Sequence, residues 1–512
     1  MQDGLGRVRA GEGIAMTDGT DALLPQITET HTGLVVLVGD RAYKVKKPVR
    51  TDFLDFSTPA SRERACAREV MLNSRLAPDS YFGVAHLQAP GGEHAEPVIL
   101  MRRHPDRCRL ATMVRSGADV TGPLSAIAGV LARFHAGARR GGEVDAEARI
   151  DAVSARWQEN LTELTRYANG VVPGLDADGV AEIERCAMAF LAGRSALFEQ
   201  RIADRRIVDG HADLLADDIF CLPEGPELLD CLEFDDRLRY VDGIDDAAFL
   251  AMDLEFLGRT DLAAHFIGRY LSLAADDAPE SLRHFYIAYR AVVRAKVECV
   301  RHTQGGPGAA GDARAHLGIA LDHLRAGGVR LIMVRGGPGT GKTTLARGIA
   351  DGIGGRVIST DDVRAAMAAR GEIDGQPGVL GEGLYSPDNV AAVYDAVLRQ
   401  AHDGLCEGHT VILDGTWTDP RHRERARRVA AEASAPVVEF VCTTALETAV
   451  GRIRSRVGGT SQVTPEIATA LAGSAGAGDN GTPGAHIIDT GREPAESVAE
   501  AVGICRTTGH HT

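Results

Sequence analysis

The residues with the clearest chemical role lie in the stretch GGPGTGKTT, positions 336–344. Glycines at this spacing are typical of loops that turn successive backbone N–H groups towards phosphate oxygens. An apolar strand pattern precedes the stretch and a helical pattern follows it, so the helix N-terminus favours an anion there. We expect Lys342 to contact the β- and γ-phosphates of ATP and Thr343 to hold Mg²⁺. The predicted nucleotide-binding residues are Gly336, Gly337, Pro338, Gly339, Thr340, Gly341, Lys342, Thr343 and Thr344.

Charged residues downstream complete a predicted phosphoryl-transfer site. Asp361, in STDDVR after the next strand, suits a base that accepts a proton from a substrate hydroxyl; a helix cap is the plainer interpretation, and Asp362 is a weaker candidate. Asp414 ends the apolar strand TVILD, as expected of a carboxylate that supports Mg²⁺. Arg452 and Arg456 lie four residues apart, either covering the transferred phosphoryl group or facing solvent.

This part of the chain resembles the small-molecule kinases of the P-loop type, such as gluconate kinase, and more distantly the zeta-toxin-like kinases. The resemblance implies a parallel α/β domain that transfers phosphate from ATP to a small acceptor.

A second stretch, GHADLLADDIF at 210–220, has the spacing of a protein-kinase catalytic loop. In that loop the aspartate, here Asp213, accepts the hydroxyl proton, and the residue five positions later binds Mg²⁺. Asp218 stands where the template has asparagine, and a carboxylate remains a good Mg²⁺ ligand. A chance match is the alternative interpretation.

Residues on either side of this stretch follow the order of the same template. Upstream, AYKVKK places Lys44 and Lys46 on one face of a strand, because strand side chains alternate. Either lysine could pair with Glu69 in the next helix to position ATP, and solvated surface charges are the alternative. Downstream, a strand is expected to deliver Asp230 and Glu233, one of which could bind Mg²⁺.

These residues resemble the aminoglycoside phosphotransferase-like kinases, which have a two-lobed protein-kinase fold. The stretch 233–255 is similar to a bacterial family that fuses such a domain to a P-loop kinase-like domain, and the likeness covers roughly residues 25–500. It implies two ATP sites. Ala212 replaces the glycine usual in that family, and no Gly-x-Gly-x-x-Gly precedes Lys44.

Local patterns predict the elements that position these residues. Gly39 and Asp40 separate two β-type runs, which predicts a hairpin over 33–49, and Thr58 with Pro59 predicts a helix start. From 329 onwards strands alternate with helices, which predicts a parallel sheet. The expected fold is therefore multidomain, α+β followed by α/β. Its predicted parts are a disordered tail (1–24), a kinase-like domain (25–303), a linker with a connecting helix (304–328) and a P-loop domain (329–506).

Composition narrows the class of protein. The net charge of −15 disfavours nonspecific binding to nucleic acid or to anionic membranes. The 9 cysteines form no Cys-x-x-Cys pair, and no apolar run approaches the length of a membrane span. We expect a cytoplasmic protein; the sequence does not indicate an oligomeric state.

The predicted function is an ATP- and Mg²⁺-dependent phosphotransferase acting on hydroxyl groups of a sugar or amino-sugar-like small molecule. One alternative is a P-loop ATPase or kinase regulated by an N-terminal pseudokinase or ligand-binding module, which the substitutions at Ala212 and Asp218 favour. A further alternative is a toxin-like kinase of a protein or a nucleotide-sugar.

Overall fold

The computed structural model describes residues 25–29, 33–50, 55–88, 95–376, 381–455 and 484–507, so the predicted tail lies outside the described residues. The chain divides into two compact units. The first contains Met1–Ala126 and Asp213–Asp236, and the second contains Ile127–Ala212 and Arg237–Thr512. No helix in the described ranges is both long enough and apolar enough to cross a bilayer.

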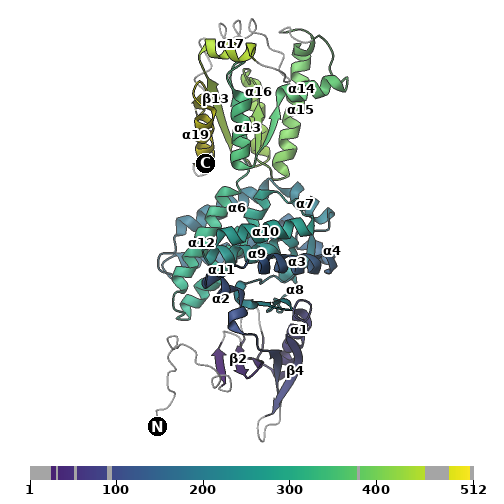
Figure 1. Cartoon of the computed structure of the whole chain (residues 1–512), viewed down its shortest axis with the longest axis vertical. Helices are drawn as coiled ribbons and strands as arrows, with labels where there is room; N and C mark the ends of the chain where they lie inside the picture. Colours follow the sequence, from purple (N-terminus) through teal and green to yellow (C-terminus); the bar gives the residue numbers. More distant parts are fainter. Residues whose placement is uncertain are drawn as a thin grey trace. The chain divides into compact units, whose positions relative to one another are not determined.

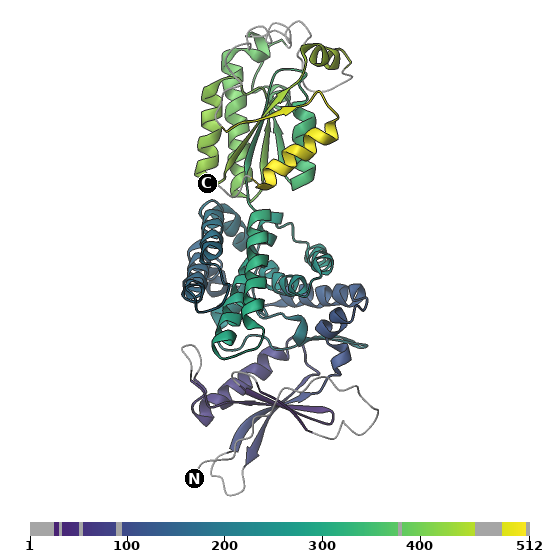
Figure 2. The same cartoon turned by 90° about the vertical axis from the view of Figure 1, so that its left-hand side faces the viewer.

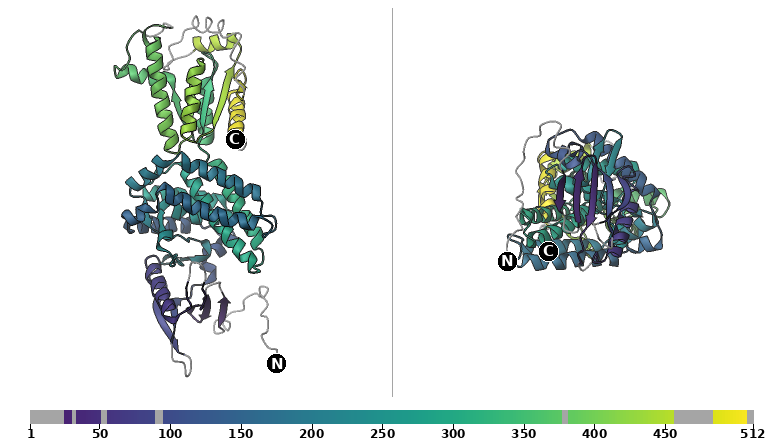
Figure 3. Two further views of the ribbon diagram at one scale, coloured as in Figure 1. Left: turned by 180° about the vertical axis from the view of Figure 1, so that it is seen from behind. Right: turned by 90° about the horizontal axis from the view of Figure 1, so that it is seen from below.

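An antiparallel sheet forms the centre of the first unit, and its strands are visible side by side in the right-hand view of Figure 3. Across the sheet the order is β1 (Gln26–Glu29), β2 (Gly33–Val38), β3 (Arg41–Lys46), β5 (Ala95–Arg102) and β4 (Tyr81–Gln88). β2 and β3 form the predicted hairpin, with Val38 opposite Arg41 and Gly39 at a φ of 58° in the turn. This φ is accessible to glycine at little cost.

Helix α1 (Pro59–Asn73) packs against β4 and β5. It starts where the sequence predicts: the Thr58 side chain accepts a hydrogen bond from the Ser61 N–H, and Pro59 is the first helical residue. The helix buries Cys66 and Glu69, and Cys66 joins an apolar core with Ile99 of the sheet. The buried face of α1 thus carries the polar side chains of Arg62, Glu69 and Asn73 beside Cys66 and Leu72.

Short elements complete the first unit. They are η2 (Asp106–Cys108), α2 (Leu110–Arg115), η3 (Ala216–Asp218), β7 (Ile219–Leu222) and β8 (Gly225–Leu228). β7 and β8 pair as an antiparallel hairpin, so Asp218 lies just before one strand and Asp230 just after the other.

The first part of the second unit is mainly helical. Its elements are α3 (Thr121–Gly137, which begins in the first unit), α4 (Gly142–Ala146), α5 (Ile150–Ala168), α6 (Ala177–Ala192), α7 (Ser195–Ala203), β6 (Ile207–Asp209), α8 (Asp236–Arg239), β9 (Tyr240–Asp242), α9 (Gly243–Phe256), α10 (Thr260–Ala274), α11 (Glu280–Thr303) and α12 (Ala309–Ala326). Trp157 and Phe190 pack on Phe285 in its core. The stretch predicted as a linker holds α12, which packs on α11 and α6.

A parallel sheet follows, flanked by helices on both faces (Figure 2). Its order is β11 (Arg356–Ser359), β12 (Val411–Asp414), β10 (Leu331–Arg335), β13 (Val437–Thr443) and β14 (His486–Asp489). The helical elements around it, several of them labelled in Figure 1, are α13 (Lys342–Ile353), α14 (Thr360–Ala369), η4 (Gly383–Tyr385), α15 (Pro387–Cys406), α16 (Pro420–Glu432), α17 (Leu446–Arg454) and α19 (Pro494–Thr507). The predicted fold class, α+β followed by parallel α/β, is confirmed.

Candidate functional site

The loop between β10 and α13 is built from glycine because neighbouring backbone lies very close to it. Gly336 has a φ of 147°, and a Cβ there would lie 2.6 Å from the carbonyl oxygen of Cys442 in β13. Gly339 has a φ of 75°, and its Cβ would collide with the backbone of Ala449 in α17. Side chains are therefore excluded at these positions, and the backbone itself forms the wall of the loop.

The first residues of α13 contact the end of β12. The Thr343 hydroxyl donates a hydrogen bond of 2.7 Å to Asp414 Oδ2, and Lys342 Nζ donates one of 2.9 Å to the carbonyl of Gly337. Burial raises the pKa of Asp414, while the Thr343 hydrogen bond and the Lys342 charge oppose that rise. The structure therefore brings together the predicted lysine, hydroxyl and carboxylate.

Asp361 lies in the first turn of α14, but it is not the helix cap. Ser359 caps the helix by accepting a hydrogen bond from the Asp361 N–H, which leaves the Asp361 carboxylate for another partner. That partner is Arg364, whose Nη1 lies 2.6 Å from Asp361 Oδ1 and whose guanidinium lies 4.4 Å from the centre of the Tyr385 ring. Asp361 also contributes to the raised pKa of Asp414, so the two carboxylates are close enough to interact.

Arg452 lies against the phosphate loop. Its Nη2 donates a 2.7 Å hydrogen bond to the carbonyl of Thr490, and its Nη1 would lie 3.4 Å from a Cβ at Gly341. Thr490 in turn donates to the Thr340 carbonyl at 2.6 Å, so it links the arginine to the loop. Arg456 lies outside the described residues.

In the first unit, Lys44 and Lys46 of β3 both pair with the buried Glu69 of α1. Lys44 Nζ is 2.8 Å from Glu69 Oε1, and Lys46 Nζ is 2.5 Å from Glu69 Oε2. Lys44 also contacts Asp230 at 2.7 Å, and Lys46 contacts Glu233 at 2.6 Å. The lysines thus share one glutamate, and each has its own second carboxylate.

The network keeps its lysines charged. Burial alone would lower the pKa of Lys44, but the charges of Asp230 and Glu69 raise it well above the usual range. Burial would also lower the pKa of Lys46, but the charges of Glu69 and Glu233 raise it above the usual value.

Asp218 lies close to two other predicted site residues. Burial raises its pKa, and the charges of Asp230 and Asp213 add to that rise. Within the described part of the chain, no three histidine, cysteine, aspartate or glutamate side chains are arranged to hold a metal ion. A metal at either site would therefore need additional ligands, such as phosphate oxygens.

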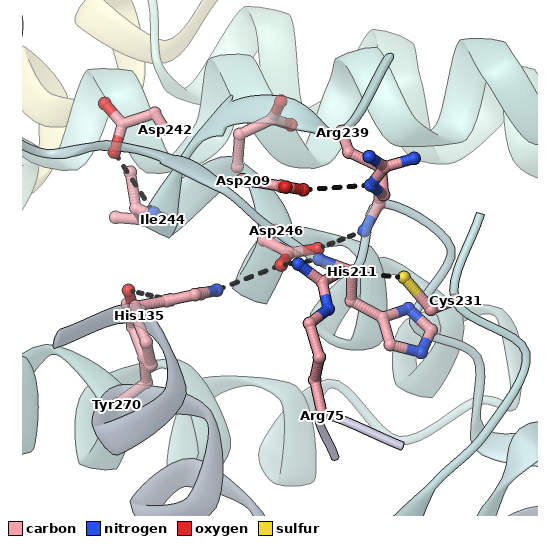
Figure 4. Close-up of polar contacts among 12 residues, drawn as sticks. Arg75, His135, Asp209, His211, Cys231, Arg239, Asp242, Ile244, Asp246 and Tyr270 are labelled. Atoms are coloured by element: carbon pink, nitrogen blue, oxygen red, sulfur yellow. Dashed lines mark hydrogen bonds and ion pairs between the residues drawn. The ribbon is translucent and has the colours of Figure 1, made fainter. Parts of the chain in front are cut away.

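Asp246, near the start of α9, fixes the backbone immediately before Asp213 (Figure 4). Its Oδ2 and Oδ1 accept the N–H groups of His211 and Ala212, each at 2.7 Å, and His135 Nε2 lies 2.9 Å from Oδ2. Although burial favours the protonated acid, His135 holds the pKa of Asp246 well below its usual range.

Sequence reasoning missed Asp246, His135, Arg364 and Thr490. The acidic pair Asp245 and Asp246, directly before the apolar run Ala247–Met252, was an available signal for Asp246. Arg364 lies three residues after Asp361, on the same face of a helix. Nothing in the sequence indicates the contacts of His135 or Thr490, which come from distant parts of the chain.

Comparisons with known proteins give a family model for one part of the chain and a relative that covers most of it. Residues 331–471 match the family model described as an AAA domain. The uncharacterized protein Rv2004c of Mycobacterium tuberculosis (strain H37Rv) is 56% identical over 488 residues, which is 95% of this chain and 97% of the relative.

Two solved structures are each similar to a portion of the chain. A sugar kinase from Janibacter sp. HTCC2649 matches 36% of this chain and 99% of its own length, with 17% identity and a TM-score of 0.28. A choline/ethanolamine kinase family protein from Mesorhizobium loti matches 59% of this chain and 92% of its own length, with 15% identity and a TM-score of 0.36.

Proposed function

This chain belongs to the same family as the mycobacterial protein Rv2004c, and from the geometry of its phosphate loop we propose that it is a kinase. In this proposal the reaction transfers a phosphoryl group from ATP to a hydroxyl group of a small molecule, sugar or amino-sugar-like. The observation that carries the proposal is the cluster of Lys342, Thr343, Asp414 and Asp361 around one glycine loop.

The residues of this loop fit Mg²⁺-ATP. The close backbone at Gly336 and Gly339 leaves a wall of peptide groups beside a helix N-terminus, which is suited to phosphate. The Thr343 hydroxyl is already oriented by Asp414, as a Mg²⁺ ligand supported by a carboxylate would be. When bound, Mg²⁺-ATP supplies the phosphoryl group and neutralises its charge.

The chain's own groups then have distinct proposed roles. Asp361 orients the acceptor hydroxyl and takes its proton, and the Arg364 ion pair holds that carboxylate in place. Lys342 and Arg452 neutralise charge on the phosphate oxygens, a contribution that is largest when donors are fixed in advance.

The first unit is proposed as a second Mg²⁺-ATP site. Its support is the ion pair between a β3 lysine and Glu69, together with Asp213 and Asp218 at the spacing of a kinase catalytic loop. In this interpretation Lys44 positions ATP and Lys46 keeps Glu69 in place, because Lys46 is the more deeply buried of the two.

One observation favours the alternative, in which the first unit is a regulatory module. Asp230 and Glu233, the candidate Mg²⁺ ligands, are each held by a lysine. Metal binding at Asp230 would have to compete with Lys44. A unit that binds a ligand without transferring phosphate would keep these ion pairs.

The proposal is tested by replacing Asp361. We expect Asp361→Asn to reduce the acceptor-dependent ADP release of the phosphate-loop site by roughly 10²–10⁴-fold, because the amide cannot accept the hydroxyl proton. The affinity for ATP, measured by calorimetry, should stay within about twofold of wild type, since phosphate binding is assigned to the loop.

Asp362→Asn is the matched control, one residue away in the same helix turn. It should retain activity within about tenfold of wild type. Equal losses in both variants, or full activity in Asp361→Asn, would show that Asp361 does not accept the hydroxyl proton.

A further inference from the structure

A cavity of about 130 Å³ in the second unit shares no lining residue with either candidate site, and several of the residues that line it are basic. Its wall includes residues from α6, α11 and α12 and the segment that leads into β10. The basic residues in this wall are Arg185, Arg194, His323, Arg325 and Arg330. No aspartate or glutamate is among the residues that line it.

Arg194 is the most deeply buried of these cations, with 1% of its surface exposed. Its Nη1 donates to the carbonyls of Gly193 and Ala433, at 2.9 and 2.7 Å. Its Nε has no hydrogen-bond partner among the described residues, and no described carboxylate pairs with it. Burial accordingly lowers the pKa of Arg194 to about 10.

Arg330 is also buried, with 6% of its surface exposed. Its Nη groups donate to the carbonyls of Gly328 and Arg325, at 2.8 and 3.1 Å, which are backbone groups at the end of α12. Its Nε also has no partner within the described ranges, and burial lowers its pKa.

The other two arginines add charge at the same place. Arg325 forms an ion pair with Glu182 at 2.8 Å, whereas Arg185 is exposed. Cys186 lines the cavity together with Arg185, Arg325 and Arg330. Burial raises the pKa of its thiol, the charges of these arginines oppose that rise, and Glu182 adds to it.

Capping of helix carbonyls accounts for only part of this arrangement. A cation at a helix C-terminus gains a small stabilisation from the helix dipole, but an uncompensated buried charge costs considerably more than that. Phe190 and Phe285, stacked at 4.4 Å, line the cavity with apolar surface and so reduce screening by water. The cavity therefore holds more positive charge than the described protein groups neutralise.

We propose that this cavity binds a small oxyanion of the phosphate class, either inorganic phosphate or the phosphate group of a phosphomonoester. Arginine is suited to this ligand because its planar fork donates paired hydrogen bonds to phosphate oxygens. Arg194 and Arg330 line the cavity, and each has a buried Nε with no partner among the described residues, while Arg185 is the exposed arginine of the wall. The site is independent of the phosphate loop and would bind its ligand in the absence of ATP.

The test is a titration of the full-length protein with sodium phosphate. Calorimetry measures the binding, and the midpoint of thermal unfolding measures the stabilisation. A parallel titration with glycerol 3-phosphate distinguishes the two ligand sources, and sodium chloride at equal ionic strength controls for salt. The titrations are repeated in Lys342→Ala, which weakens any contribution of the phosphate loop.

The decisive variant is Arg185→Met, which changes an exposed side chain and should leave folding intact. We expect it to weaken phosphate binding by about fivefold or more, and Arg194→Met to abolish binding. Arg166→Met, an exposed arginine of α5 that does not line the cavity, should bind phosphate within about twofold of wild type.

Tighter binding of glycerol 3-phosphate than of phosphate would identify a phosphomonoester as the ligand, and the reverse would identify the free ion. An equal stabilisation by sodium chloride would overturn the proposal. So would phosphate affinities in Arg185→Met and Arg194→Met that match wild type.

Discussion

At Ala212 the backbone adopts a conformation that alanine rarely takes, with a φ of 67°. The residue is buried, and its N–H donates to Asp246 Oδ1 at 2.7 Å. A left-handed conformation costs a residue with a Cβ roughly 1–2 kcal/mol. In the aminoglycoside phosphotransferase-like kinases that the sequence resembles, glycine is usual at this position. The positive φ explains that glycine, because glycine adopts it at little cost.

We therefore expect Ala212→Gly to leave the free energy of unfolding unchanged or to raise it by up to about 1 kcal/mol. The gain comes from relief of backbone strain and is reduced by the loss of a buried methyl group. Urea unfolding measures it against Ala181→Gly, at an exposed helical position in α6, which should cost about 1 kcal/mol. A loss at Ala212→Gly as large as the loss in this control would show that the strain is not present.

Only some contacts of the lysine and carboxylate network could be predicted from the sequence. Alternation along β3 correctly placed Lys44 and Lys46 on one face, because both contact Glu69. The pairing with Asp230, 186 residues away, could not be read from local spacing, since it depends on how the chain returns to the sheet.

Local signals predicted the starts of individual elements well. The Thr58 cap, the Gly39 turn and the strand that ends in Asp414 all appear where expected, because each depends on a few neighbouring residues. The long strand expected to carry Asp230 and Glu233 is shorter: β8 ends at Leu228, and Asp230 has a φ of 63°. That backbone conformation is incompatible with a continuing strand.

Helices α11 and α12 bury histidines, which makes the stability of the second unit depend on pH. Burial, with a contribution from His323, lowers the pKa of His284 to about 4, and burial lowers the pKa of His316 to about 4. In the unfolded chain both would have a pKa of about 6.5. The unfolded state therefore binds more protons below that pH, and stability is lost as the pH falls from about 6.5 to about 4.

We expect this loss to reach roughly 2–3 kcal/mol per histidine, measured by urea unfolding at pH 7.5, 6, 5 and 4. His316→Phe keeps an aromatic ring against Phe256 and should make the pH profile less steep, while the contribution of His284 remains. His302→Gln, near the end of α11, is the control and should leave the profile unchanged. A profile in His316→Phe that is as steep as in wild type would contradict the assignment.

On the scale of the whole molecule, the order of strands and helices predicted the fold class. It could not predict that Asp213–Asp236 joins Met1–Ala126 in one compact unit while the rest of the chain forms another. This division depends on contacts between residues far apart in sequence, and local periodicity does not predict such contacts. The predicted domain boundaries at 303 and 329 remain predictions.

The proposal of two separate phosphotransfer sites in one chain can be tested in a single assay. ADP release by the purified protein is followed with Mg²⁺-ATP and a panel of sugars and amino sugars, for wild type, Lys342→Ala and Asp213→Ala. We predict that each variant loses a different acceptor-dependent part of the activity by about 10²-fold or more. If Lys342→Ala abolishes all turnover while Asp213→Ala changes nothing, the first unit is not a second kinase site and the proposal of two phosphotransfer sites is wrong.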